Sequence, residues 1–303
     1  MPAAPLSVDT GHHAPIFDAR LNFFGNRLAT CSGDHLVKIF EVKESGMCQL
    51  AEVSGHTGPV WQVDWANPRF GTMFASAGYD CRAIVWKEAE VGWQKQYEYT
   101  GHGASVNTIA FAPERCGLIF ASGSSDGTIA VHTYDHLNDK WESVKINEAH
   151  PQGVNSISWA PGVTLGKDGR TVEKRFVSCG NDKFLKIWVC NESGDWVLEK
   201  VNVSHNDFVR DVAWCPVVFS ALHRIVSVGQ DRRVVMWKCN NIGRDEWTFE
   251  QISKTSGALW HVNWSACGTF FSVSGEDNKN IFFREYANEW AEVKDEEEEF
   301  VEK

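Results

Sequence analysis

The stretch Phe74–Trp86, which reads Phe-Ala-Ser-Ala-Gly-Tyr-Asp-Cys-Arg-Ala-Ile-Val-Trp, determines the fold because variants of it occur six times. Its aspartate recurs at intervals of 46, 46, 56, 49 and 46 residues, as Asp34, Asp80, Asp126, Asp182, Asp231 and Asp277. Six residues later stands a ring-bearing residue: Phe40, Trp86, His132, Trp188, Trp237 and Phe283. Four residues before the aspartate stand Thr30, Ser76, Ser122, Ser178, Ser227 and, as the exception, Val273. Self-similarity at such a period indicates a repeat architecture.

A second anchor lies upstream of each aspartate. It is a histidine in five copies and a threonine in the sixth: His12, His56, His102, His150, His205 and Thr255. An apolar residue follows four positions on, at Ile16, Val60, Val106, Val154, Val209 and Leu259. Five positions further stand Leu21, Trp65, Phe111, Trp159, Trp214 and Trp264, with apolar residues two positions before each. Apolar residues with a period of two predict a strand with one buried face.

A third series of aromatic residues completes the unit. It falls 13 to 16 residues after the aspartate, at Trp93, Trp141, Trp196, Trp247 and Trp290, with Met47 in the first copy. Each opens a further strand, so the unit has inner, second, third and outer strands. Most of the 14 tryptophans are thereby interpreted as packing residues between units. This is the WD-repeat pattern, which is typical of β-propellers.

We therefore predict an all-β chain that forms a six-bladed WD-repeat β-propeller. The propeller is expected as one domain over residues 12–293, after an N-terminal segment 1–11 and before an acidic, disordered tail 294–303. The blades are expected at residues 12–54, 55–100, 101–148, 149–203, 204–253 and 254–293.

The recurring polar residues are predicted to form one hydrogen-bonded network per blade, with the aspartate taking the histidine N–H. The set is His12, Asp34, His56, Ser76, Asp80, Trp86, His102, Ser122, Asp126, His150, Ser178, Asp182, Trp188, His205, Ser227, Asp231, Trp237 and Asp277. A catalytic His–Asp pair is the competing interpretation, but five equivalent pairs in one chain favour a structural role. The copies with Phe40, His132, Thr255, Val273 or Phe283 are expected to have incomplete networks.

Composition argues against several classes of function. The net charge is −11, and the last ten residues carry −4 of it, so the body is also acidic. An acidic body argues against direct binding of nucleic acid or anionic lipid. No stretch reaches the ~18–20 apolar residues of a membrane helix, and the N-terminus lacks a signal-peptide pattern.

No cofactor or metal site is expected. The nine cysteines lack a CxxC pair and are interpreted as reduced thiols of a cytosolic or nuclear protein. The loop Gly123–Gly127 resembles a phosphate loop but has no lysine and no following helix. We find no nucleophile elbow and no carboxylate pair outside the repeat, so we predict that the protein is not an enzyme.

One segment exceeds the repeat. Residues Pro161–Lys174 lie between the inner and second strands of the fourth unit and account for the 56-residue interval. Such insertions map to surface loops. The segment is either a tolerated loop or a contact loop for a second partner.

The strand count predicts an open ring. The sixth unit brings its own outer strand at Glu289–Val293, and Leu6–Asp9 remains as a stray strand without a blade to join. Six complete blades without a latch leave an open edge between the first and sixth blades, which would expose sheet faces. We hypothesise that another chain adds a seventh blade there by β-augmentation. The individual contact residues are not assigned.

Several segments are more specific than a generic repeat. They are Gly55–Pro68, Phe74–Glu88, Val209–Pro216, Leu259–Ser265 and Val273–Lys279. Through them the chain resembles the Sec-thirteen family of WD-repeat vesicle-coat proteins over about residues 9 to 293, departing in the insertion and the Glu-rich tail.

The resemblance implies an open six-bladed propeller completed by a partner's blade, with no catalytic residues. It implies a Sec-thirty-one-type outer-coat subunit as partner, in the COPII coat on the cytoplasmic side of the endoplasmic reticulum membrane, with membrane association only through the coat. It also implies a helical scaffold nucleoporin as partner in the nuclear pore complex. The alternatives are a Seh-one-type nucleoporin or a nutrient-signalling complex subunit and, more distantly, a ligand-binding or enzymatic propeller.

Overall fold

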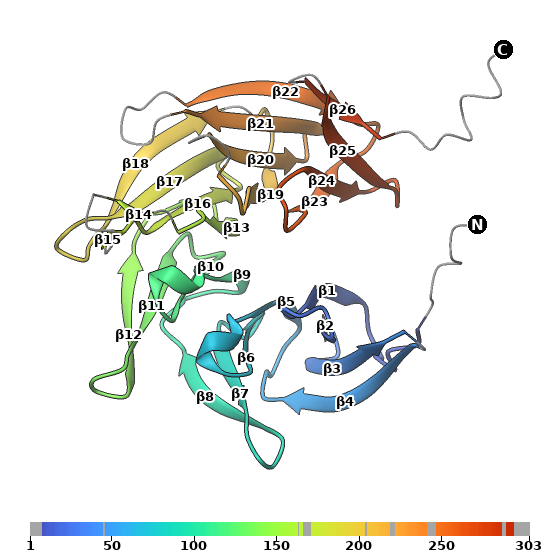
Figure 1. Ribbon diagram of the computed structural model, residues 1–303, viewed down its shortest axis with the longest axis vertical. Helices are drawn as coiled ribbons and strands as arrows, with labels where there is room; N and C mark the ends of the chain where they lie inside the picture. The colour runs from blue at the N-terminus through green and yellow to red at the C-terminus, as the bar shows by residue number, and fades with distance from the viewer. Residues whose placement is uncertain are drawn as a thin grey trace. The chain divides into compact units, whose positions relative to one another are not determined.

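A computed structural model of the chain describes residues 8–44, 46–162, 164–165, 171–203, 205–218, 222–240, 247–286 and 289–293. The chain divides into two compact units, residues 1–154 and 155–303. Each unit is built from four-stranded antiparallel sheets, which we call blades and number along the chain (Figure 1).

The first unit contains blades 1, 2 and 3. The strands of blade 1 are β1 (Ile16–Leu21), β2 (Arg27–Ser32), β3 (Leu36–Lys43) and β4 (Gly46–Ser54). Those of blade 2 are β5 (Val60–Trp65), β6 (Met73–Gly78), β7 (Ala83–Glu88) and β8 (Trp93–Tyr99). Those of blade 3 are β9 (Val106–Phe111), β10 (Ile119–Ser124), β11 (Ile129–Asp135) and β12 (Lys140–Ile146).

The second unit holds blades 5 and 6 and the strands of blade 4. The strands of blade 4 are β13 (Val154–Trp159), β16 (Arg175–Gly180), β17 (Phe184–Cys190) and β18 (Trp196–Val203). Those of blade 5 are β19 (Val209–Trp214), β20 (His223–Gly229), β21 (Arg233–Cys239) and β22 (Thr248–Lys254). Those of blade 6 are β23 (Leu259–Trp264), β24 (Phe270–Gly275), β25 (Asn280–Tyr286) and β26 (Glu289–Glu292).

Burial changes from strand to strand within blade 2. All six residues of β6 are buried, whereas the fourth strand β8 has exposed residues along its length. Neighbouring blades pack mainly through their first strands, β1 on β5 and β5 on β9 in the first unit, and β19 on β23 in the second. A blade face is thus buried only where another blade lies against it, because a single twisted sheet cannot cover both of its own faces.

Aromatic rings fill the space between blades, as the tryptophan series predicted. In blade 2 the rings of Phe74 and Trp86 stack with centroids 6.3 Å apart, and Trp93 meets Phe74 at 4.8 Å. Phe74 and Trp86 share a core with Ala29 and Ile39 of blade 1. The tryptophans therefore serve the packing of one blade on the next.

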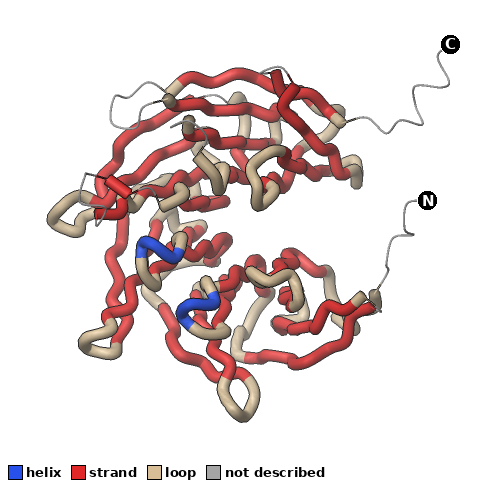
Figure 2. Tube along the Cα trace, in the orientation of Figure 1, coloured by secondary structure: helices blue, strands red, loops and turns tan. Residues whose placement is uncertain are grey.

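The six four-stranded sheets confirm the prediction of an all-β, six-bladed WD-repeat propeller. Helical structure in the described part of the chain is limited to two short 3₁₀ turns, η1 (Pro68–Phe70) and η2 (Glu114–Cys116), drawn in blue in Figure 2. The described residues contain no helix long and apolar enough to cross a membrane.

The segments outside the repeat are only partly described. The predicted outer strand of blade 6 is present as β26. Of the stray strand predicted at Leu6–Asp9, Val8 and Asp9 are not in a strand, and residues 6–7 lie outside the described residues. The insertion contributes a two-residue pair, β14 (Thr164–Leu165) with β15 (Thr171–Val172), and residues 163 and 166–170 lie outside the described part. The tail 294–303 lies outside it as well.

Candidate functional site

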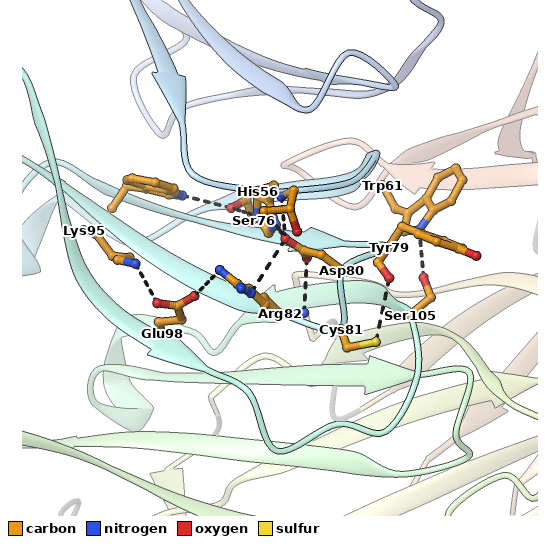
Figure 3. A network of polar contacts seen from close by, with 12 residues as sticks. His56, Trp61, Ser76, Tyr79, Asp80, Cys81, Arg82, Lys95, Glu98 and Ser105 are labelled. Atoms are coloured by element: carbon orange, nitrogen blue, oxygen red, sulfur yellow. Dashed lines mark hydrogen bonds and ion pairs between the residues drawn. The ribbon is translucent and has the colours of Figure 1, made fainter.

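Blade 2 carries a complete polar network around His56 (Figure 3). His56 Nδ1 lies 2.9 Å from Asp80 Oδ1, and His56 Nε2 lies 2.8 Å from Ser76 Oγ. The indole Nε1–H of Trp86 donates to the same Ser76 Oγ at 2.9 Å. Because a carboxylate only accepts, Nδ1 carries the proton, and a neutral ring then accepts the Ser76 hydroxyl proton at Nε2. The hydrogen bonds run in one direction, from Trp86 through Ser76 and His56 to Asp80.

The aspartate also fixes the turn between the second and third strands. Asp80 accepts from the backbone N–H of Thr57 at 2.9 Å and of Arg82 at 3.3 Å. Burial by itself would raise the pKa of Asp80, but these bonds and the one from His56 outweigh burial and hold it below its usual value. A Cβ on Gly78 would lie 2.5 Å from His56 Nδ1, so this turn requires glycine for close approach.

Blade 5 repeats the blade 2 network. His205 bonds Asp231 Oδ1 at 2.9 Å and Ser227 Oγ at 2.8 Å, and Trp237 Nε1–H donates to Ser227 at 3.1 Å. Blade 1 has a shorter version, because Phe40 offers no N–H in the tryptophan position.

In blade 1, His12 contacts Asp34 Oδ2 at 2.8 Å and Thr30 Oγ1 at 2.9 Å.

Blade 3 differs from the expectation. His102 Nδ1 lies 3.8 Å from Asp126 Oδ2, beyond hydrogen-bond distance, and instead lies 3.0 Å from Thr128 Oγ1. The Thr128 hydroxyl in turn donates to Asp126 Oδ1 at 2.6 Å. The sequence prediction of a direct His102–Asp126 bond is therefore wrong, because Thr128 lies between the two groups.

The network of blade 3 is nevertheless closed at its other end. His102 Nε2 lies 2.8 Å from Ser122 Oγ, and His132 Nε2 lies 3.0 Å from the same oxygen. The other ring nitrogen of His132 lies 3.2 Å from the hydroxyl of Tyr97. His132 thus takes the tryptophan's role as donor, and our expectation of an incomplete network in this copy is wrong.

Burial keeps both histidines of blade 3 neutral. It lowers the pKa of His102 to about 4, against the opposing charge of Asp126, and it lowers the pKa of His132 below its usual value. The pKa of Asp126 falls to about 2, because hydrogen bonds from Thr128 and the Gly103 N–H outweigh its own burial.

Blade 4 keeps the indole bond. Trp188 Nε1–H donates to Ser178 Oγ at 2.9 Å, and Asp182 Oδ1 accepts from the backbone N–H of Phe184 at 3.2 Å. His150 belongs to the first unit, where it is fully buried and its backbone N–H donates to Gly127 O at 3.0 Å.

Blade 6 replaces the polar network by apolar packing. Thr255 donates its hydroxyl to Gly257 O at 2.8 Å, and Asp277 Oδ1 accepts a local bond from the backbone N–H of Lys279 at 3.1 Å. The rings of Phe271 and Phe283 stack 5.0 Å apart where the serine–tryptophan bond lies in blade 5. The prediction of an incomplete network in the sixth copy is confirmed.

These networks do not form a reaction centre. In blades 2 and 5 the histidine and serine are buried, the side chains of Asp80 and Asp231 are 5% and 6% exposed, and all of these groups are hydrogen-bonded within their own blade. Among the described residues no group of three His, Cys, Asp or Glu side chains is placed to hold a metal ion. The networks can fix turns and join strands.

A second set of polar side chains, which sequence reasoning missed, joins successive blades. On the first strands, Asp18 Oδ2 accepts from Val63 N–H at 3.3 Å, Gln62 Oε1 from Ile109 N–H at 2.7 Å, and Asp211 Oδ2 from Val262 N–H at 2.8 Å. The signal in the sequence is a polar residue just before the inner apolar residue of each strand.

A further carboxyl that links two blades, Asp64, has a strongly shifted pKa. Asp64 Oδ2 accepts from Phe111 N–H at 2.7 Å. Burial raises the pKa of Asp64 to about 6, against the lowering effects of Arg20 and of this hydrogen bond. Asp64 therefore joins blades 2 and 3 at a position where its charge is poorly solvated.

In blades 1 to 5 one face of the sheet carries a buried apolar residue of the third strand, and we call this the following face. In blade 6 the following face is exposed. The residue just before the tryptophan position is 0–2% exposed in blades 1 to 5, at Ile39, Val85, Val131, Ile187 and Met236. In blade 6 the same position is Phe282, which is 46% exposed. Trp260, on the first strand of this blade, is 45% exposed. An apolar residue at a core position of the repeat thus faces solvent in the last blade.

The opposite face of the sheet, which we call the preceding face, is exposed in blade 1. The apolar residue that opens the first strand is 0–2% exposed in blades 2 to 6, at Val60, Val106, Val154, Val209 and Leu259. In blade 1 it is Ile16, which is 43% exposed, and Leu21 at the end of the strand is 57% exposed. Each of these two faces is a candidate binding face of its own unit.

The repeat, the blade networks and the paired sheets define a WD-repeat β-propeller protein. The family model described as WD domain, G-beta repeat matches residues 4–41, 47–87, 93–133 and 141–189. The repeats of blades 1 to 4 are therefore also found by comparison with known domains.

Curated relatives match almost the whole chain. A "Protein SEC13 homolog" of Caenorhabditis briggsae is 48% identical over 289 residues, covering 94% of this chain and 93% of the relative. The homologue of the same name in Homo sapiens is 46% identical over 297 residues, covering 95% and 92%. A "Protein transport protein sec13" of Emericella nidulans is 39% identical over 314 residues, covering 98% and 100%. The chain belongs to the SEC13 family of WD-repeat proteins.

Proposed function

We propose that this chain is a non-enzymatic scaffold subunit of a protein-transport coat, completed by a blade from another chain. The observation that carries the proposal is the exposure of Phe282 and Ile16 at positions that are buried in every other blade. Burying apolar surface yields about 25 cal/mol per Å², so each uncovered sheet face favours a partner segment that covers it.

The partner that suits these faces is a strand-forming segment. A sheet face with alternating apolar residues is covered best by another twisted sheet, as each blade covers its neighbour in this chain. The name of the Emericella nidulans relative refers to protein transport. We therefore propose a Sec-thirty-one-type outer-coat subunit as partner, in the COPII coat on the cytoplasmic side of the endoplasmic reticulum membrane, with membrane association only through that coat.

The same faces would serve a second assembly. A helical scaffold nucleoporin of the nuclear pore complex that carries a blade-forming segment would meet the same apolar residues. Roles as a Seh-one-type nucleoporin or as a subunit of a nutrient-signalling complex remain the alternative proposals, and they require the same kind of partner.

Co-expression with the Sec-thirty-one-type subunit of the same organism tests the proposal. The complex is expected to co-purify at a 1:1 ratio, and Ile16→Asp and Phe282→Asp are each expected to weaken it at least tenfold. Leu137→Asp is the matched control, because Leu137 is 94% exposed in the β11–β12 turn of blade 3. Wild-type affinity in both face variants, or no complex with the wild-type chain, would overturn the proposal.

A further inference from the structure

One position of the first strand supplies a hydrogen-bond acceptor to the next blade. It is the residue just before the strand's last, aromatic or leucine position: Arg20, Asp64, Ala110, Ser158, Ala213 and Asn263 in blades 1 to 6. We call it the joint position. Its alternation with the apolar residues on either side points it away from the blade's own core.

Where the joint residue has an acceptor side chain, that side chain bonds the backbone of the next blade. Asp64 Oδ2 accepts from the N–H of Phe111 at 2.7 Å in the step from blade 2 to blade 3. Ser158 Oγ accepts from the N–H of Trp214 at 2.9 Å in the step from blade 4 to blade 5. In both steps the donor is the same register position, the final aromatic residue of the next first strand.

Where the joint residue cannot accept through its side chain, its backbone carbonyl accepts instead. Arg20 O receives the indole N–H of Trp65 at 2.9 Å, and Ala213 O receives that of Trp264 at 3.1 Å. All four blade-to-blade steps within the two units therefore place an acceptor of the joint residue against a donor of the next first strand. Adjacent first strands are not paired in one sheet, so these bonds satisfy groups that would otherwise be buried alone.

Blade 6 has an acceptor at this position and no following blade in the described part of the chain. Asn263 is exposed, and it lies on β23, the strand that also carries the exposed Trp260. We propose that Asn263 Oδ1 accepts a hydrogen bond from a backbone N–H of the first strand of the partner's blade. This inference rests on the proposed function and adds the group that sets the register of the added blade.

The chemistry of the joint defines what the partner must offer. The partner residue opposite Asn263 has a backbone N–H, so it is not proline, and it stands at the end of a strand whose apolar residues cover Trp260 and Phe282. An amide oxygen can accept as the carboxylate does in blade 2 and the hydroxyl does in blade 4. The occupant is therefore an extended polypeptide segment, recognised through its main chain.

Three substitutions at one position test the joint in the full chain bound to the Sec-thirty-one-type subunit. Asn263→Ala removes the acceptor and is expected to weaken the complex about tenfold, which corresponds to about 1.4 kcal/mol. Asn263→Asp and Asn263→Ser keep an acceptor and are expected to bind within about threefold of wild type. Gln94→Ala, an exposed change on the outer strand of blade 2, is the matched control.

The readouts separate this inference from the proposed function. Failure of the wild-type chain to bind the subunit would overturn the proposed function. If the wild-type chain and Asn263→Ala bind the subunit with equal affinity, the proposed hydrogen bond of Asn263 is overturned and the proposed function is not. A fall of several degrees in the melting temperature of the free Asn263→Ala chain would also overturn it, because the amide would then act within this chain.

Discussion

Blades 5 and 6 are neighbours with the same four-stranded plan, yet they are stabilised in different ways. Blade 5 joins His205, Ser227 and Trp237 by buried hydrogen bonds, and its Met236 is fully buried. Blade 6 has an apolar residue in the serine position, stacked phenylalanines, and Phe282 half exposed. The comparison teaches that the repeat fixes the strands of a blade, whereas the neighbouring chain segment decides whether its face is covered.

The largest expected effect contrasts the equivalent core positions of these blades. Met236→Ala should lower the free energy of unfolding by about 2–5 kcal/mol, because it leaves a cavity in a closed core. Phe282→Ala should lower it by about 1 kcal/mol, because nearly half of that side chain already faces water. Urea unfolding of the free chain measures both. If the two variants lose the same free energy of unfolding, Phe282 is covered within the chain and the two blades do not differ at this position.

The next effect brings the residue of blade 6 into blade 5. Ser227→Val introduces the side chain of Val273 at the position where the Ser227 hydroxyl bonds His205 Nε2 and Trp237 Nε1. It should cost about 2–4 kcal/mol, because His205 Nε2 and Trp237 Nε1 each lose their partner. Ser227→Thr keeps the hydroxyl, as Thr30 does in blade 1, and should cost less than half as much in the same unfolding assay. A cost equal to that of the valine variant would contradict a role for the hydroxyl.

A pH effect sharpens the comparison between blades with and without histidine. The pKa of His102 is about 4 in the folded chain, below its usual value of about 6.5, because burial disfavours the charged ring. Between these values the unfolded chain binds more protons, so stability rises with pH and is lost as pH falls from 6.5 towards 4. His102 should account for roughly 2–3 kcal/mol of the loss between pH 7.5 and pH 4.

The test is the unfolding free energy at both pH values for the wild-type chain and His102→Thr, which introduces the residue of blade 6. The variant should be less stable at pH 7.5 and show a smaller loss on acidification. Thr255→Asn in blade 6 is the control and should leave the pH dependence unchanged. An unchanged slope in His102→Thr would contradict the assignment of the neutral ring.

The smallest effect concerns the inserted hydroxyl of blade 3. Thr128→Val should cost about 1–2 kcal/mol, because it leaves His102 Nδ1 without its partner while Asp126 keeps its bond to the Gly103 N–H. Differential scanning calorimetry of the free chain measures the change. Stability equal to wild type would indicate that His102 and Asp126 can bond directly.

The sequence predicted the strands well because their signals are local and repeated. The spacing from Ser76 through Asp80 to Trp86 is set within one hairpin, so it carries the turn and the bond together. Thr128 was missed because its hydroxyl acts through its position in space, between two groups already assigned to each other. Asp64 was missed because its partner, the Phe111 N–H, lies 47 residues along the chain.

The candidate site was predicted only as a region. The strand count indicated an open edge, but exposure of Ile16 and Phe282 depends on what covers them, which no repeat position encodes. The role proposed for Asn263 depends on the register that it shares with Asp64 and Ser158, whose bonds reach residues far along the chain.

Hydroxyl-radical footprinting of the chain, free and bound to the Sec-thirty-one-type subunit, tests the central claim most directly. Ile16 of blade 1 and Trp260 and Phe282 of blade 6 should be labelled in the free chain and protected in the complex. Phe23 and Phe249, exposed elsewhere, should be labelled equally in both. Continued labelling of Phe282 and Trp260 in the complex, or their protection in the free chain, would contradict the account.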